Sequence, residues 1–159
     1  ERIAGDENAS IINVENMEAQ KSEDIDEIQV YKEIGEKLGI SIVRLGYKPK
    51  DMFLKKYDLS EEQRKATLLY DFDNQVIRYT MYMNDKASSL GQIETDQLID
   101  EYQIETAQKI IVEIKEYKIK DSELNRYVAD FEYMDAQYQF MGVIEKEEFE
   151  RIIKNLAFL

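Results

Sequence analysis

The last third of the chain alternates apolar and polar residues in two short segments and then changes to a helical spacing. Residues 127–133 and 137–143 alternate on either side of a turn at 134–136. Such alternation is typical of strands with one buried face. In residues 145–156, which follow directly, apolar side chains recur at i, i+3, i+4 and i+7, at Phe149, Ile152, Ile153 and Leu156. The pattern predicts strand, turn, strand and helix.

A second hairpin is predicted in the middle of the chain. Residues 66–72 alternate up to Asp73–Asn74, a pair suited to a tight turn, and residues 77–83 continue the alternation. Further strands are predicted over the ranges 40–45, 52–57, 103–106 and 109–119.

The first helix is predicted over residues 24–38. Asp24 is placed to cap it, Glu27 has capping-box spacing, and Gly39 stops it. Helix, consecutive strands and helix indicate an α+β fold, because strands joined by short turns form antiparallel sheets. We expect an antiparallel sheet of about five to seven strands, with an N-terminal and a C-terminal helix packed on one face. Residues 1–21 are interpreted as an acidic linker or loosely docked arm, and 22–159 as a single α+β domain.

Three missing residue types narrow the chemistry. The chain of 159 residues has no Cys, no His and no Trp. Cysteine nucleophiles, Cys/His zinc sites and Ser-His-Asp arrangements are therefore excluded. No catalytic motif is present, and we expect no enzyme activity, no cofactor and no metal.

The charge distribution disfavours nucleic acid as a partner. The net charge is −13, and residues 1–29 hold nine acidic residues against Arg2 and Lys21. Phosphate backbones require a positive surface, so we expect no nucleic-acid binding.

One basic patch interrupts the acidic chain, and two interpretations of it stay open. It could receive an anionic ligand, such as a cell-wall polymer or an acidic partner segment, since local potential can oppose net charge. Alternatively, its residues are solvated and balance the acidic N-terminal arm. The basic patch consists of Arg44, Lys48, Lys50, Lys55 and Lys56.

Three weaker candidates have simpler explanations. Oxygen ligands for calcium occur near the predicted hairpin (Asp71, Asp73, Asn74, Asp85), but turn chemistry explains Asp73–Asn74. A carboxylate pair for glycoside hydrolysis is not singled out among so many acids. Eleven tyrosines could line an aromatic groove, but core packing is the simpler expectation.

The C-terminal pattern resembles a known bacterial family. The segment from Val128 to Gly142, followed by Glu147–Glu148–Phe149 and by residues 152–156, is similar to domain-of-unknown-function family four-three-six-seven. The hairpin at 69–77 looks like that family's middle section. The resemblance covers about residues 35–159. Phe131 stands where family members tend to have Trp.

This resemblance implies an extracytoplasmic C-terminal module of a membrane-anchored protein in Gram-positive bacteria, in anti-sigma-factor-like or lipoprotein-like chains. No catalytic residues carry over. The start at Glu1 rather than Met suggests that a membrane anchor lies upstream. We expect contact with the membrane only through that anchor.

Two functional hypotheses follow, with a third less favoured. The first is a non-enzymatic sensor or interaction domain, which meets an unknown protein or cell-envelope ligand through the uncovered sheet face or the 40–57 region. The second is a carrier of an apolar ligand between a curved sheet and the helices, lined by methionines (Met81, Met83, Met134, Met141). The third is a carboxylate-based hydrolase.

Overall fold

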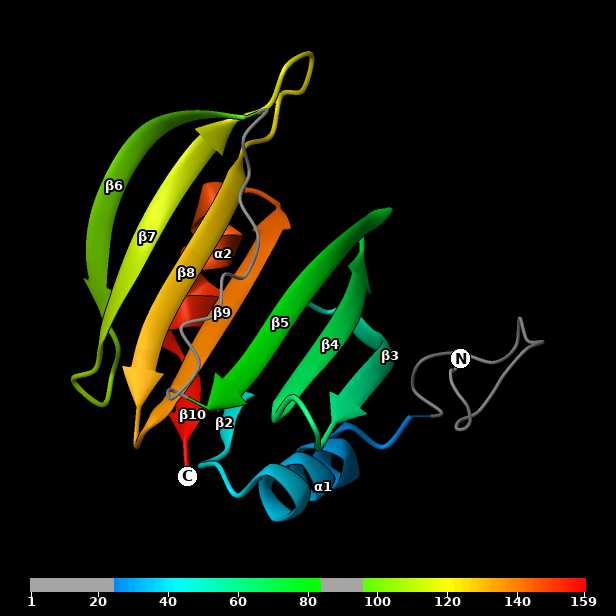
Figure 1. Cartoon of the computed structure of the whole chain (residues 1–159). Helices are drawn as coiled ribbons and strands as arrows, with labels where there is room; N and C mark the ends of the chain where they lie inside the picture. The colour runs from blue at the N-terminus through cyan, green and yellow to red at the C-terminus, as the bar shows by residue number, and fades with distance from the viewer. Residues whose placement is uncertain (1–24, 84–95) are drawn as a thin grey trace.

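The computed structural model describes residues 25–83 and 96–159. Its main element is a seven-stranded antiparallel sheet in the spatial order β3-β4-β5-β9-β8-β7-β6. The pairing of β5 with β9 joins an N-terminal group of three strands to a C-terminal group of four (Figure 1). The strands are β3 (Phe53–Ser60), β4 (Lys65–Phe72), β5 (Gln75–Met83), β6 (Gln97–Glu105), β7 (Ile111–Lys118), β8 (Arg126–Tyr133) and β9 (Ala136–Val143).

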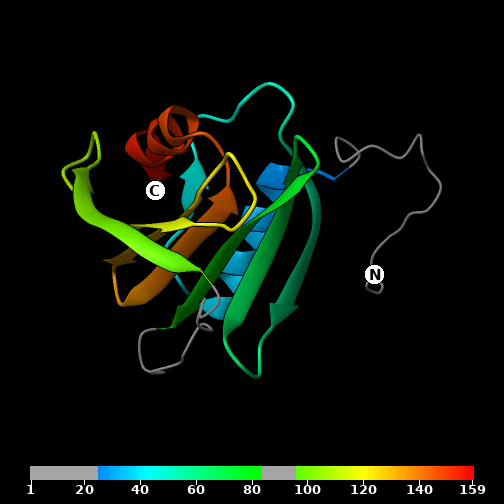
Figure 2. The same ribbon diagram turned by 90° about the horizontal axis from the view of Figure 1, so that it is seen from above.

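Both helices pack on the same face of this sheet, which we call the inner face. Helix α1 (Glu27–Leu38) lies against β4 and β5, and α2 (Lys146–Lys154) lies against β8 and β9 (Figures 1 and 2). A continuous series of ring contacts joins them. Tyr31 of α1 contacts Tyr79, Tyr79 contacts its cross-strand partner Phe140, and Phe140 contacts Phe149 of α2, with centroid distances of 6.5, 5.7 and 5.8 Å. The predicted α+β fold is therefore confirmed.

A small second sheet lies between the helices on the inner face. Strand β2 (Val43–Leu45) pairs antiparallel with β10 (Leu156–Phe158). The Tyr79 hydroxyl donates to the Val43 carbonyl at 2.7 Å, which ties β2 to the main sheet. Phe158 of β10 packs edge-on against Phe131, so the small sheet completes the core.

The C-terminal strand corrects one prediction. The helix was expected to continue to Leu156, but α2 ends at Lys154 and Leu156 begins β10. Leu156 is buried in either geometry, so its apolar character did not distinguish a helix from a strand. The predicted strand at 103–106 is likewise the end of the longer β6.

The predicted Asp73–Asn74 turn and the stop of the first helix at Gly39 are confirmed, but its predicted start and cap at Asp24 are wrong, because the helix begins at Glu27. Asp73 and Asn74 have φ of 53° and 64°, the positive values that a tight hairpin turn requires. Gly39 ends α1 with φ of 70°. The N-cap of α1 is Asp26, whose side chain accepts from the Gln29 amide, while Asp24 lies outside the described residues. Within the described ranges no helix has the length and apolar content to cross a bilayer.

Candidate functional site

The basic patch divides into residues with different surroundings. Arg44 lies in β2, paired with Ala157, and its Nε is buried with no hydrogen-bond acceptor among the described residues. Lys48 is engaged in an ion pair. Lys50, in the loop before β3, and Lys55 and Lys56, in β3, are exposed. The exposed charge therefore comes from Lys50, Lys55 and Lys56.

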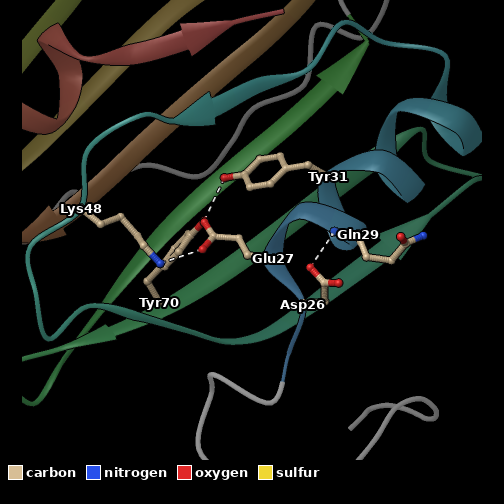
Figure 3. A network of polar contacts seen from close by, with 6 residues as sticks. All are labelled: Asp26, Glu27, Gln29, Tyr31, Lys48 and Tyr70. Atoms are coloured by element: carbon tan, nitrogen blue, oxygen red, sulfur yellow. Dashed lines mark hydrogen bonds and ion pairs between the residues drawn. The ribbon is translucent and has the colours of Figure 1, made fainter.

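Lys48 is one end of a hydrogen-bonded chain that runs into the core (Figure 3). Its Nζ donates to Glu27 Oε1 at 2.7 Å, and the Tyr70 hydroxyl donates to Glu27 Oε2 at 2.5 Å. Tyr70 and Tyr31 hydroxyls lie 2.9 Å apart. Lys48 also lies over the Tyr70 ring, 5.5 Å from its centroid. These contacts fix the start of α1 on β4.

The two tyrosines of this hydrogen-bonded chain, Tyr31 and Tyr70, are held in their neutral form by burial. Burial raises the pKa of Tyr70 well above its usual value, and the neighbouring Tyr31 and Glu27 add to the increase. Burial likewise raises the pKa of Tyr31, against a smaller opposing effect of the Tyr70 hydrogen bond. Neutral hydroxyls can both donate and accept here, but they do not exchange protons near neutral pH. The hydrogen bonds among Lys48, Glu27, Tyr70 and Tyr31 therefore tie the start of α1 to β4.

A second polar cluster joins α2 to the other half of the sheet. Glu116, only 8% exposed, accepts from the Tyr127 hydroxyl at 2.9 Å and from Asn125 Nδ2 at 2.7 Å. Lys146 Nζ is 3.9 Å from the other Glu116 oxygen. Tyr102 donates to Glu150 at 2.7 Å. Hydrogen bonds and the ion pair satisfy these groups, which is the usual state of buried polar residues.

The opposite, outer face of β3, β4 and β5 has a different character. Phe53, Asp71 and Val76 form one cross-strand row, and Lys56, Leu69 and Arg78 form the next. Phe53 is 38% exposed and Val76 is 56% exposed. Lys56 and Arg78 are also exposed, and Leu69 between them is half-buried. We call this group the β3–β5 outer surface: Phe53, Lys56, Leu69, Val76 and Arg78.

A shallow open depression of about 150 Å³ lies within this surface. It is lined by Lys56 and Leu69, together with Tyr57, Asp58 and Thr67. The surface thus combines apolar side chains, a recess and charges of both signs, because Asp71 and Asp58 lie beside the cations Lys56 and Arg78. Exposed apolar side chains rimmed by charged ones are typical of protein contact sites.

The sequence did not identify most of this surface. Lys56 was predicted as part of the basic patch, but Phe53, Leu69, Val76 and Arg78 were not. The reason is a β-bulge between Leu54 and Lys56, which places both Phe53 and Lys56 on the outer face although they are three residues apart. Simple alternation assigns them to opposite faces. The sequence did contain one indication: Val76 directly precedes the buried Ile77 in an alternating strand, so its side chain lies on the opposite, outer face.

The other candidates are explained by packing. The four methionines do not share one space: Met81 is buried in the core, Met134 is exposed in a turn, and Met141 lies on the outer face beside Arg78. Most tyrosines proposed for a groove are core residues, as expected. Among the described residues no group of three or more acidic side chains could hold a metal ion, and Asp85 lies outside them.

A comparison with protein-family models gives a match that covers most of the chain. The sequence model of a family described as Domain of unknown function (DUF4367) matches residues 42–156, from just before β2 to the first residue of β10. No curated protein and no solved structure matches the chain. The hairpin β8–β9 and helix α2, which carried the resemblance in the sequence, lie inside the matched range. The chain therefore belongs to the DUF4367 family.

Proposed function

We propose that this domain is a non-enzymatic interaction module that binds an acidic, partly apolar partner segment through the β3–β5 outer surface. The observation that supports it most is the exposure of Phe53 and Val76 in one row beside Lys56 and Arg78 in the next. Exposed apolar groups flanked by charge are typical of protein contact sites.

The inner face supports the same assignment by what fills it. Between the sheet and the helices, aromatic rings meet each other at close range, including Tyr127 with Phe149 at 5.2 Å and Phe131 with Tyr138 at 4.9 Å. Residues that a carrier would need as cavity lining are already packed against one another. The outer surface is therefore the better candidate for binding.

Titration of the ¹⁵N-labelled chain tests the proposal. The acidic probe is a synthetic peptide of alternating Glu and Leu, and the control probe alternates Lys and Leu. We expect the acidic peptide to shift the amide signals of Leu69, Val76 and Arg78, and we expect added salt to weaken its binding.

Charge reversal at two exposed positions gives the matched variant. Lys56→Glu with Arg78→Glu is expected to reduce affinity for the acidic peptide at least about tenfold, because like charges then face each other. Lys115→Glu with Lys118→Glu, at exposed positions on β7, serves as the control and leaves affinity nearly unchanged. Shifts centred on β6 and β7, or equal binding of both peptides, would contradict the proposal.

We also propose that the domain lies outside the cytoplasm, attached to the bacterial membrane in its natural context. The support is the family resemblance. Because residues 1–159 contain no cysteine, Lys120→Cys introduces a single thiol into the domain at an exposed turn, and the unaltered full-length protein gives the background labelling. In intact cells producing the full-length protein, a membrane-impermeant maleimide should label this residue. Labelling only after cell lysis would contradict the location.

A further inference from the structure

We infer that two copies of this domain associate through β3, with the two β3 strands antiparallel about a twofold axis at Tyr57. The axis is perpendicular to the sheet, so each seven-stranded sheet continues into the other. Strand β3 is one end of the sheet and β6 is the other (Figure 1). Among the described residues β3 pairs only with β4, so the backbone groups along its other side can pair with an added strand. This inference goes beyond the proposed function and does not rest on it.

The charged residues around β3 complement an antiparallel copy of themselves. Residues 50–64 include four basic and four acidic side chains, so this segment is neutral in a chain of net charge −13. Three of the bases precede Tyr57, and three of the acids follow it. An antiparallel copy therefore brings the basic half of one strand against the acidic half of the other. In chain order, the charged residues are Lys50, Asp51, Lys55, Lys56, Asp58, Glu61, Glu62 and Arg64.

The alternation of side chains along β3 favours this register. Lys56 and Asp58 lie on the outer face, and Tyr57 between them lies on the inner face. Side chains directly opposite each other in paired strands share a face. With the axis at Tyr57, Lys56 lies opposite Asp58 of the second copy, twice, at about 5 Å between Cβ atoms, where opposite charges attract. An axis at Lys56 or at Asp58 would place like charges opposite each other.

The residues next to β3 do not oppose this arrangement. On the inner face Tyr57 meets Tyr57 of the second copy, and such cross-strand aromatic pairs are favourable. Its hydroxyl donates to Glu33 of α1 at 3.3 Å, and Glu33 also forms an ion pair with Lys37 at 3.2 Å. On the outer face Asp71 and Lys65 of β4 lie one strand further from the second copy, about 10 Å away, and their charges are opposite.

The other end strand lacks this complementarity. Strand β6 contains Asp100, Glu101 and Glu105 and no basic residue. Antiparallel pairing of β6 with itself would therefore bring carboxylates together. The bases Lys115 and Lys118 lie opposite β6 residues but on β7, one strand further from any added copy. Self-association is therefore assigned to β3.

Sedimentation velocity of the chain tests the association. The bulge between Leu54 and Lys56 shortens the regular ladder, and small interfaces are weak. We therefore expect a reversible dimer that is populated at roughly 100 µM and above. The measured mass should rise with concentration from 18.8 kDa toward twice that value, and added salt should reduce the rise. A chain that stays monomeric up to about 1 mM would overturn the inference.

Two charge reversals identify the interface. Lys56→Glu and Asp58→Lys each replace two attractive pairs by two repulsive ones, so each should lower the association constant at least about tenfold. When the two variants are mixed, dimers should form again, because one strand then carries two acids and the other two bases. Lys118→Glu and Glu101→Lys make the same charge changes at exposed positions on β7 and β6 and should leave association unchanged. A mixture that does not associate, or equal losses in the controls, would overturn the inference.

Cysteine substitution tests the register. Because residues 1–159 contain no cysteine, Tyr57→Cys places one thiol at the axis, where the two Cα atoms would lie about 5 Å apart and oxidation by diamide should link the copies. Leu59→Cys lies on the same face, but its two copies would be about 14 Å apart and should link far less. Equal linking of the two variants would overturn the proposed axis.

Arg78→Glu separates this inference from the proposed function. Arg78 lies on β5, two strands from β3, so this variant should dimerise normally while its affinity for the acidic Glu-Leu peptide falls. A chain that binds the peptide and stays monomeric would overturn the inference alone. A dimer that does not bind the peptide would overturn the proposed function alone.

Discussion

The inner and outer faces of β4 and β5 use alternate residues of the same strands for different purposes. On the inner face Leu68, Tyr70 and Tyr79 are fully buried. On the outer face their neighbours Leu69, Val76 and Arg78 keep part or most of their surface in contact with solvent. Apolar burial is the dominant stabilising contribution to folding. The comparison indicates that one face holds the fold together, which leaves the other free to serve as a contact surface.

The largest expected difference between the faces is in stability. Phe140→Ala should lower the free energy of unfolding by about 3–5 kcal/mol, because it removes the ring that touches both Tyr79 and Phe149 and leaves a cavity. Val76→Ala, on the outer face, should change it by less than about 0.5 kcal/mol. Urea unfolding followed by circular dichroism measures both. Similar losses for the two variants would remove the distinction between the faces.

A hydroxyl on the inner face should have the next largest effect. Tyr70→Phe removes the group that links Tyr31 to Glu27 and should cost about 1–3 kcal/mol, because buried polar atoms lose their partner. Tyr47→Phe is the control. Its hydroxyl also binds a glutamate, Glu148, but Tyr47 is only partly buried, so a smaller loss is expected. Equal losses in the same urea experiment would show that burial does not set the value of these bonds.

High pH should weaken the inner face. Burial raises the folded-state pKa of Tyr70 and Tyr79 above the value near 10 of an unfolded tyrosine. The contribution of these two tyrosines to the free energy of unfolding is therefore fully present below about pH 10. It is lost as the pH rises toward their folded-state pKa. Each such tyrosine lowers stability by about 1.4 kcal/mol per pH unit in that window.

Urea unfolding between pH 8 and pH 11 measures this loss. Tyr70→Phe should show a shallower decline than the unaltered protein, because one titrating group is removed. Identical declines in the two proteins would assign the alkaline loss to other groups, such as lysines.

The smallest expected effect concerns a carboxylate on the outer face. Asp130 in β8 accepts from Gln139 Nε2 at 3.0 Å, yet burial raises its pKa above the usual value. Its ionised form is therefore disfavoured in the folded state, and it lowers stability as the pH rises above about 4. Asp130→Asn should increase stability at pH 7 by less than about 1 kcal/mol, and the gain should shrink toward pH 3. Thermal unfolding at the two pH values measures it; a loss at pH 7 would contradict the reasoning.

Much of the fold could be predicted from local pattern, and the exceptions have a common cause. Strands β4, β5, β8 and β9 alternate regularly, and their turns contain residues that accept positive φ, such as Asn74 and Asp135. Strand β10 was missed because three residues are too few to show a period. Its identity depends on pairing with β2, more than a hundred residues earlier.

The candidate surface was harder to predict than the fold. Its residues come from three strands, and the bulge in β3 alters which side chains share a face. The exposed lysines of the basic patch were visible in the sequence as a charge cluster. The apolar residues of the surface were not visible in this way. Val76 resembles any other apolar strand residue until the structure shows that the neighbouring Ile77 faces the core.

The pairing of β2 with β10 has a mechanical consequence. Phe158 pairs with Val43, so the chain leaves the small sheet at Leu159 from the same end at which it arrives from α1. Tension applied between α1 and Leu159 would pull β2 and β10 apart from the Val43–Phe158 end. The residue pairs would therefore separate one after another instead of all at once. In a pulling experiment with these attachment points, the last strand should detach first and at low force, while the seven-stranded sheet remains intact.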